Sequence, residues 1–206
     1  MIAVTQIVIL FFSIILHEVA HGYVAFLKGD DTAYKRGRLT LNPLPHIDLF
    51  GTILLPLFMY FMKFKFLFGW AKPVPINPNN LKNPQKDLVL IGAAGPAANL
   101  VLMILFWGIY KAAVYYKLGV TFATGAAFGI AINLLLLLFN AIPIPPLDGS
   151  RVFGGLLRGK LYDYYLKLDK FGFIIIIILL YVGLLDKFIF PIMGVIMDFM
   201  GVHLSF

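Results

Sequence analysis

The sequence of 206 residues contains no cysteine and a single glutamate, and only 13% of its residues are charged. Without cysteine the chain has no disulfide and no thiolate to offer a metal ion, although this absence does not fix its compartment. The 61% share of hydrophobic residues excludes an ordinary soluble domain, and the long apolar runs predict a protein of the lipid bilayer. We expect no nucleic-acid partner, because the net charge of +7 comes from residues that lie between the apolar runs.

Three apolar runs are long enough to cross a membrane as helices: residues 2–27, about 88–116 and about 121–142. The first run has no preceding lysine or arginine and no small-residue cleavage signal, so we expect it to be retained. Residues 171–206 are also apolar, and predict either two short helices or one kinked span. We find no internal repeat, and expect one all-α polytopic membrane domain over residues 1–206, with a three-helix core at about residues 2–155.

The lone glutamate lies in the first apolar run, within the sequence His17-Glu18-Val19-Ala20-His21. Residues four apart lie on one face of a helix, so His17 and His21 can both bind one metal ion. Glu18 lies beside them, where a carboxylate can take a proton from water activated by that ion. Ionisable residues are costly inside a bilayer, which favours a functional role for this cluster over a merely structural polar pair.

Asp148 is the best third ligand, because it follows the third apolar run in the segment AIPIPPLDG, residues 141–149. Prolines end the helix there, and irregular backbone near membrane depth is tolerated only where protein buries it or it lines a wet cavity. A plain turn leaving the membrane is the alternative interpretation. Two histidines, one aspartate and one open position form a set that suits catalytic zinc, though cobalt and iron are not excluded.

A shared metal site also constrains topology. His17 and Asp148 both lie toward the C-terminal ends of their helices, so the first and third runs must point in the same direction. One crossing between them, residues 88–116, meets this requirement. Residues 49–68, interrupted by glycine, proline and lysine, are therefore predicted to form a re-entrant or β-like membrane element rather than a span.

The two metal motifs, HEVAHG at residues 17–22 and NAIPIPPLDG at residues 140–149, resemble those of the site-2 protease family of intramembrane zinc metalloproteases. The segments FGWAKPVP at 68–75 and GAAGPAAN at 92–99 are similar to its short prokaryotic members. The resemblance implies one Zn²⁺ held by His17, His21 and Asp148, with Glu18 as catalytic base and acid. It also implies that the substrates are transmembrane segments of other proteins. The chain has no room for the PDZ or CBS domain of larger members.

Four further residues are weaker candidates for substrate binding. Asn140 is a hydrogen-bond donor for the substrate carbonyl or the oxyanion, with an interhelical hydrogen bond as the alternative. His46 is a candidate at the entrance, with an ordinary loop histidine as the alternative. Trp70 and Val74 lie in an extended, proline-rich segment that is either a strand-like partner for an unwound substrate or a rigid connector. For Asn99 and Asn133 we expect interhelical hydrogen bonds.

A transporter or metal-ion channel is the alternative function. Such a path usually spreads ionisable residues through the membrane, whereas here they cluster at one depth. The sequence leaves the natural substrate and the oligomeric state open.

Basic residues predict the orientation of the protein. One side of the expected topology receives twelve of them, and the other receives only Lys111 and Lys117, with the side of Lys187 left open. The crowded side is cytoplasmic by the positive-inside rule, so the N-terminus lies outside and the metal site opens toward the cytosol of a multi-pass cell-membrane protein. The crowded set is Lys28, Lys35, Arg36, Arg38, Lys72, Lys82, Lys86, Arg151, Arg158, Lys160, Lys167 and Lys170.

Single cysteines test this orientation without background, since the chain has none of its own. Ala3→Cys is expected to react with a membrane-impermeant thiol reagent on intact cells, and Lys160→Cys only after the cells are opened. Labelling of both positions from the same side would contradict the topology.

Overall fold

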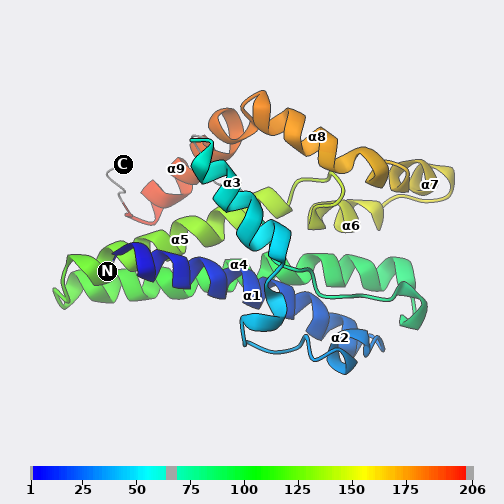
Figure 1. Ribbon diagram of the computed structural model, residues 1–206, viewed down its shortest axis with the longest axis horizontal. Coiled ribbons are helices and arrows are strands. Elements are labelled where there is room, and N and C mark those ends of the chain that lie inside the picture. The colour runs from blue at the N-terminus through cyan, green and yellow to red at the C-terminus, as the bar shows by residue number, and fades with distance from the viewer. Residues whose placement is uncertain (1, 64–68, 203–206) are drawn as a thin grey trace.

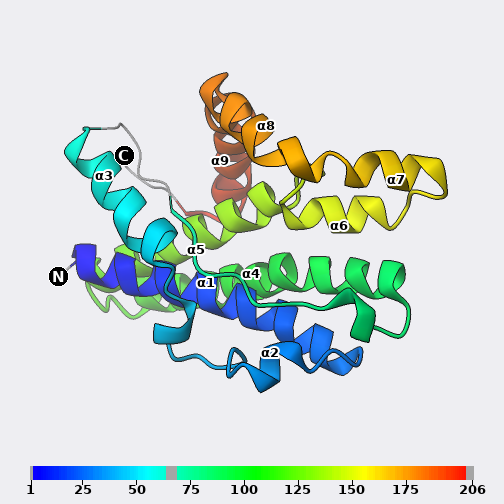
Figure 2. The ribbon, with the colours of Figure 1, turned by 45° about the vertical axis from the view of Figure 1, so that its right-hand side comes forward.

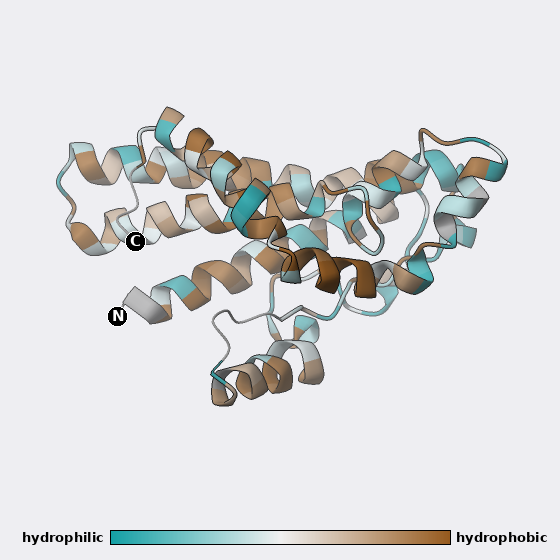
Figure 3. Ribbon diagram, turned by 90° about the horizontal axis from the view of Figure 1, so that it is seen from above, coloured by the Kyte–Doolittle hydropathy of each residue, from teal (hydrophilic) through white to brown (hydrophobic). Residues whose placement is uncertain are grey.

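The computed structural model describes residues 2–63 and 69–202, and in these ranges the protein is all helical, with no strand. Three helices have the length and hydropathy of membrane spans: α1 (Ile2–Leu27), α4 (Pro84–Tyr115) and α5 (Val120–Asn140). Only 28%, 28% and 39% of the most apolar windows of these helices are buried inside the protein, so their outer surfaces suit a lipid environment. The prediction of an all-α polytopic membrane protein is confirmed (Figure 3).

The three long helices lie side by side, and α4 runs opposite to α1 and α5 (Figures 1 and 2). One crossing therefore separates the two parallel helices, as the shared metal site requires. Glycine allows the close approach of α4 and α5: a Cβ at Gly129 would lie 2.4 Å from the ring of Phe106. Small residues at such a contact are typical of packed membrane helices.

The stretch from Leu49 onward forms a short helix that is not long enough to count as a span. A π-helical turn, η2 (Leu49–Leu54), continues into α3 (Leu55–Phe61), and the apolar part ends at Met59. Over these residues the element is helical rather than strand-like. Residues 64–68 of the predicted re-entrant element lie outside the described part of the chain.

The C-terminal apolar residues form two helices joined through a bend. The first is α8 (Asp169–Tyr181), and after the bend of 65° the π-helical η4 (Leu185–Ile189) leads into α9 (Phe190–Phe199). Buried Met193 and Met197 of α9 join the core between α4 and α5, where unbranched methionine side chains fill irregular space. The start of α1 and the end of α9 lie at the same end of the bundle as the turn between α4 and α5 (Figure 1).

Short helices surround the opposite end of the bundle, where α1 and α5 both end. They are α2 (Thr32–Lys35), η1 (Leu44–His46), η3 (Pro78–Asn80), α6 (Asp148–Gly154) and α7 (Lys160–Leu166). Helices α7 and α8 hold the proline-rich loop before Asp148. Tyr165 Oη donates to Pro143 O at 2.8 Å, and a Cβ at Gly172 would lie 1.8 Å from Pro145 O.

An extended segment of residues 70–77, here called the strap, crosses α1 near this end (Figure 2). Its backbone is tied to the loops around it. Lys72 N donates to His46 O at 2.9 Å, Lys72 O accepts from Arg38 Nη2 at 2.6 Å, and Asn77 N donates to Asp30 Oδ2 at 2.6 Å. A Cβ at Gly22 would lie 2.7 Å from Val74 Cγ1, so glycine lets the strap lie directly on α1.

Asp30 anchors the far end of the strap just beyond the end of α1. Its fully buried carboxylate also accepts from Asn80 Nδ2 at 2.9 Å and from the N–H and hydroxyl of Thr32. Burial by itself raises the pKa of Asp30, but these donors outweigh it and hold the pKa below its ordinary value. Because the unfolded chain binds the proton more readily, the carboxylate stabilises the fold above a pH of about 4, and this contribution is lost as the pH falls through the lowered pKa.

We expect Asp30→Asn to lower the free energy of unfolding at pH 7 by about 1–3 kcal/mol, because the new amide nitrogen faces N–H donors. Melting temperatures of the detergent-solubilised variant and parent should differ at pH 7 and converge below about pH 4. Asp31→Asn is the matched control, because Asp31 makes only an exposed ion pair with Lys35, and such pairs contribute little. An equal loss in both variants, or a loss independent of pH, would contradict the assignment.

Candidate metal centre

The predicted ligands come together at one point. His17 Nε2 and His21 Nε2 lie 3.0 and 3.1 Å from Asp148 Oδ2, and 3.1 Å from each other. All three side chains are buried, and among the described residues they form the one group of histidine and acidic side chains with this arrangement. Two of them come from successive turns of α1, and the third is the first residue of α6.

Local sequence explains how Asp148 reaches the pair. Prolines end α5 and turn the chain, so that α6 begins directly with Asp148. A Cβ at Gly149 would lie 2.3 Å from Ala141 O, so only glycine allows the first turn of α6 to pack against the end of α5. Burial raises the pKa of Asp148, but hydrogen bonds and charge from His17 and His21 lower it further than burial raises it. The ligand is therefore anionic at neutral pH.

The Nδ1 atoms of both imidazoles, which point away from the triangle, are hydrogen-bonded. His21 Nδ1 donates to Ile91 O at 2.6 Å, and His17 Nδ1 lies 2.6 Å from Asn99 Oδ1. With the protons on Nδ1, both Nε2 atoms direct lone pairs at each other and at a carboxylate oxygen. These lone pairs repel one another unless a cation lies between the three atoms.

The donor set fits a zinc ion. A tetrahedral ion with bonds of about 2.0–2.1 Å needs ligand atoms about 3.3 Å apart, close to the separations here. The space for it is kept open by Gly95 of α4, where a Cβ would lie 2.4 Å from His21 Nε2 and 2.6 Å from His17 Nε2. Imidazole and carboxylate ligands in threes are typical of catalytic zinc, which keeps a fourth position open.

Glu18 is half-buried and faces the strap. Its Oε2 accepts a hydrogen bond from Val74 N at 2.8 Å. The buried guanidinium of Arg38 lies near enough to interact with this carboxylate: burial lowers the pKa of Arg38 and the charge of Glu18 partly restores it. The side chain predicted to be the base is thus fixed by the strap and by a buried cation.

The weaker candidates lie around the triangle rather than in it. His46 is buried, with its Nε2 donating to Thr40 O at 2.9 Å and its backbone oxygen holding the strap. Trp70 packs over Gly51 and contacts Phe173 of α8 edge to face, with ring centroids 6.3 Å apart. The histidine near the C-terminus, residue 203, lies outside the described residues.

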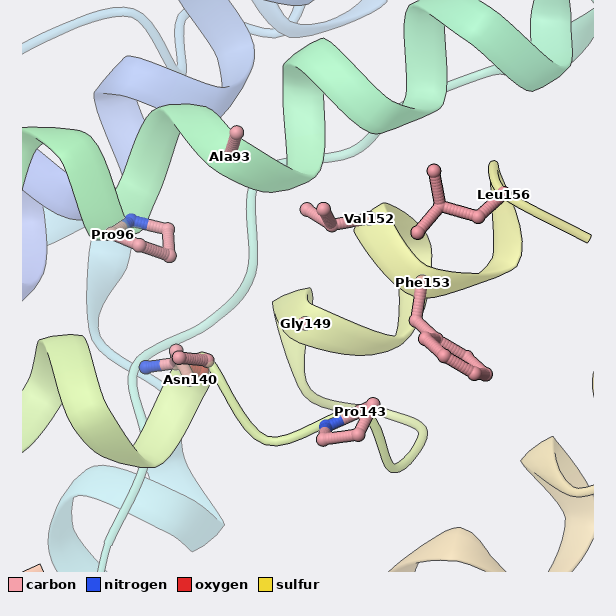
Figure 4. A pocket seen from close by; sticks show the side chains of 9 residues that line it. Ala93, Pro96, Asn140, Pro143, Gly149, Val152, Phe153 and Leu156 are labelled. Carbon is pink, nitrogen blue, oxygen red and sulfur yellow. The ribbon is translucent and has the colours of Figure 1, made fainter.

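Asn140 lines an apolar cavity of about 360 Å³ between α4, α6 and the end of α5 (Figure 4). Its Nδ2 donates to Leu136 O of its own helix at 3.1 Å. Gly149, the neighbour of Asp148 in the chain, lines the same cavity. Asn140 therefore shares the wall of an apolar pocket with the residue that follows Asp148. The other lining residues are Ala93, Pro96, Ala141, Pro143, Val152, Phe153 and Leu156.

Sequence reasoning missed the contact of Asn99 with His17. The interhelical hydrogen bond expected for Asn99 is present, since Asn99 Nδ2 donates to Asn133 Oδ1 at 2.9 Å. The side-chain oxygen of Asn99, however, contacts Nδ1 of His17, one of the predicted metal ligands. The available signal was spacing: Gly95 and Asn99 are four apart, and so share the face of α4 that meets His17 and His21.

Known proteins resemble this chain over most of its length. It is 37% identical over 196 residues to YwhC of Bacillus subtilis (strain 168), described as a candidate zinc metalloprotease, and the match covers 91% of this chain and 85% of YwhC. It is 32% identical over 190 residues to Rip2 of Mycolicibacterium smegmatis, described in the same way, with 92% of this chain and 71% of Rip2 covered. Rip2 of Mycobacterium tuberculosis is 27% identical over 193 residues, with the same coverage. No family model and no solved structure matches the chain.

Gly95→Ala tests whether the space between the histidines holds an ion. The added methyl group would occupy that space, so we expect the purified variant to lose its bound metal while remaining folded. Metal per chain measured by mass spectrometry checks this. Gly108→Ala on the same helix is the matched control, because nothing lies within 4 Å of its Cβ position. Metal retention in Gly95→Ala would contradict the site.

Proposed function

The chain belongs to the family of these zinc metalloproteases, and from this premise we propose that it is an intramembrane endopeptidase of the site-2 protease type. Its substrates are transmembrane segments of other membrane proteins, which it cuts within or next to the bilayer. The observation that carries the proposal is the buried triangle of His17, His21 and Asp148 among spanning helices. In a protease that acts on soluble peptides this triangle would have no reason to lie there.

The depth of the ligands supports an intramembrane site. His17 and His21 lie ten and six residues before the end of α1 at Leu27. At about 1.5 Å per residue they are about 15 and 9 Å inside the helix end. Asp148 reaches this depth because α5 ends and turns before it. We assign the end of the bundle that holds α2, α6 and α7 to the cytoplasm, on the strength of its basic residues.

His17, His21 and Asp148 would hold the ion through Nε2, Nε2 and Oδ2. When bound there, zinc polarises the scissile carbonyl and lowers the pKa of water toward about 7. Glu18 takes the proton of the attacking water and delivers it to the leaving amine. The N–H of Val74 fixes the Glu18 carboxylate by one oxygen, which leaves the other to exchange the proton. We also assign Asn140 as the donor to the oxyanion, a role for which its Nδ2 would have to turn away from Leu136 O.

The strap is the element to which we assign the unwound substrate. Peptide bonds in a helix are protected by their own hydrogen bonds, so the substrate must be extended before attack. Trp70 and Lys72 bond to the protein through both N–H and C=O, and Val74 does so through its N–H. Since successive residues of an extended chain face opposite sides, Ala71 presents its N–H and C=O on the other side, where a substrate strand can pair.

Glu18→Gln separates chemistry from metal binding. The amide keeps the size of the side chain but cannot take a proton, so cleavage of a test transmembrane substrate by the purified protein should fall by about 10²–10⁴-fold. Zinc per chain should remain that of the parent, because Glu18 is not a ligand. His17→Ala is the comparison that should lose both.

Full activity in Glu18→Gln would exclude this mechanism. A parent protein that carries no zinc and cleaves no substrate would exclude the proposed function and favour the alternative, a transporter or metal-ion channel.

A further inference from the structure

We propose that Asn99 is a positioning residue of the metal centre, which sets the tautomer and orientation of His17 through a chain of hydrogen bonds fixed at its far end by a backbone carbonyl. The proposal rests on the metal site of the proposed function. It assigns to a side chain outside the ligand set the task of presenting the first ligand to the ion.

The chain of hydrogen bonds crosses the bundle. His17 Nδ1 lies 2.6 Å from Asn99 Oδ1, and Asn99 Nδ2 lies 2.9 Å from Asn133 Oδ1. Asn133 Nδ2 then lies 2.9 Å from both Ser13 Oγ and Gly129 O. Asn99 and Asn133 are 0% exposed and Ser13 is 1% exposed, so water does not compete for these partners. The links join α1, α4 and α5.

The direction of every link follows from the end at Gly129. A backbone carbonyl can only accept, so the amide nitrogen of Asn133 must face it, and its oxygen must face Asn99. That oxygen requires the nitrogen of Asn99, which turns the Asn99 oxygen toward His17. An oxygen without a proton requires N–H at His17 Nδ1. The lone pair of His17 is thereby placed on Nε2, the atom that faces His21 and Asp148.

The two histidines are held in different ways. His21 Nδ1 donates to the backbone oxygen of Ile91, an acceptor that no side-chain substitution removes. His17 depends on a side chain for the same purpose. Without an acceptor at residue 99, His17 either keeps a buried unpaired N–H or moves its proton to Nε2, and the second choice blocks the ligand position.

A purely structural role for the asparagines is the competing explanation, because polar side chains also hold membrane helices together. In that case substitutions would lower the stability of the metal-free protein and leave metal affinity unchanged. Loss of a partner that orients a metal-bound histidine instead costs about 10–100-fold in metal affinity. Metal affinity and metal-free stability are therefore measured on the same set of variants.

Cobalt(II) is the probe, since its visible absorption reports ligand geometry and competition with a chelator gives its Kd. Asn99→Leu removes the acceptor at nearly constant size, and we expect it to weaken cobalt binding by about 10–100-fold and change the spectrum. Asn99→Asp keeps an acceptor for His17 but loses the donor for Asn133. It should melt at a lower temperature yet bind cobalt nearly as tightly as the parent.

The remaining members of the chain give a graded series. Asn133→Leu frees the Asn99 amide to turn, so it should weaken cobalt binding by a smaller factor than Asn99→Leu. Ser13→Ala should weaken it least, because Gly129 O still fixes Asn133. These two variants carry the test if Asn99→Leu does not fold.

Parent-like cobalt affinity and spectrum in a folded Asn99→Leu variant would overturn the proposal, and so would equal losses in Asn99→Asp and Asn99→Leu. Unchanged affinity in Asn133→Leu would overturn the fixed chain. If the parent binds cobalt no better than His17→Ala, the metal centre of the proposed function fails, which is a separate result.

Discussion

Three lone pairs directed at one point inside an apolar bundle are the constraint on which this structure depends. Two imidazole nitrogens and a carboxylate oxygen lie within 3.1 Å of one another, and with both imidazoles protonated on Nδ1 their buried lone pairs repel one another unless a cation lies between them. Parallel α1 and α5 bring the ligands to one depth, the proline-rich loop carries Asp148 back toward α1, and Gly95 keeps the centre empty of side chains. All three features are needed to bring the three ligand atoms together around one position.

The same constraint explains why polar groups near the centre come in complete networks. The Nδ1 atoms of His17 and His21 each have an acceptor, and Asn99, which supplies the acceptor for His17, is itself hydrogen-bonded to Asn133. Farther out, where α1 leaves the apolar region, charged groups take over this role. Arg38 and Asp30 hold the two halves of the strap, so the segment proposed to receive the substrate is fixed from outside the spans.

Patterns along the chain were enough to predict the long helices and the meeting of His17, His21 and Asp148. The first helix has the predicted bounds, because the uninterrupted apolar run ends abruptly at the polar residues Lys28-Gly29-Asp30, which mark the end of the helix. The meeting of Asp148 with the histidines was inferred from the two motifs, and it in turn predicted a single crossing between the first and third helices. The partner of His17 could not be predicted in this way, because it depends on how α4 is rotated about its axis, and an apolar helix carries almost no amphipathic signal for that rotation. The π-helical turn at Leu49 was equally hidden, since composition does not distinguish it from an α-helix or a β-like loop.

The distance along the chain between the ligands has a consequence for biosynthesis. His21 and Asp148 are 127 residues apart, so the ribosome makes the histidines long before their third partner. During insertion, α1 enters the membrane with a pair of imidazoles but no complete site, and α4, α5 and the loop after α5 must follow before the triangle closes. A nascent or truncated chain therefore carries the motif HEVAH without a hydrolytic centre, and the membrane is exposed to the activity only once the bundle has been assembled.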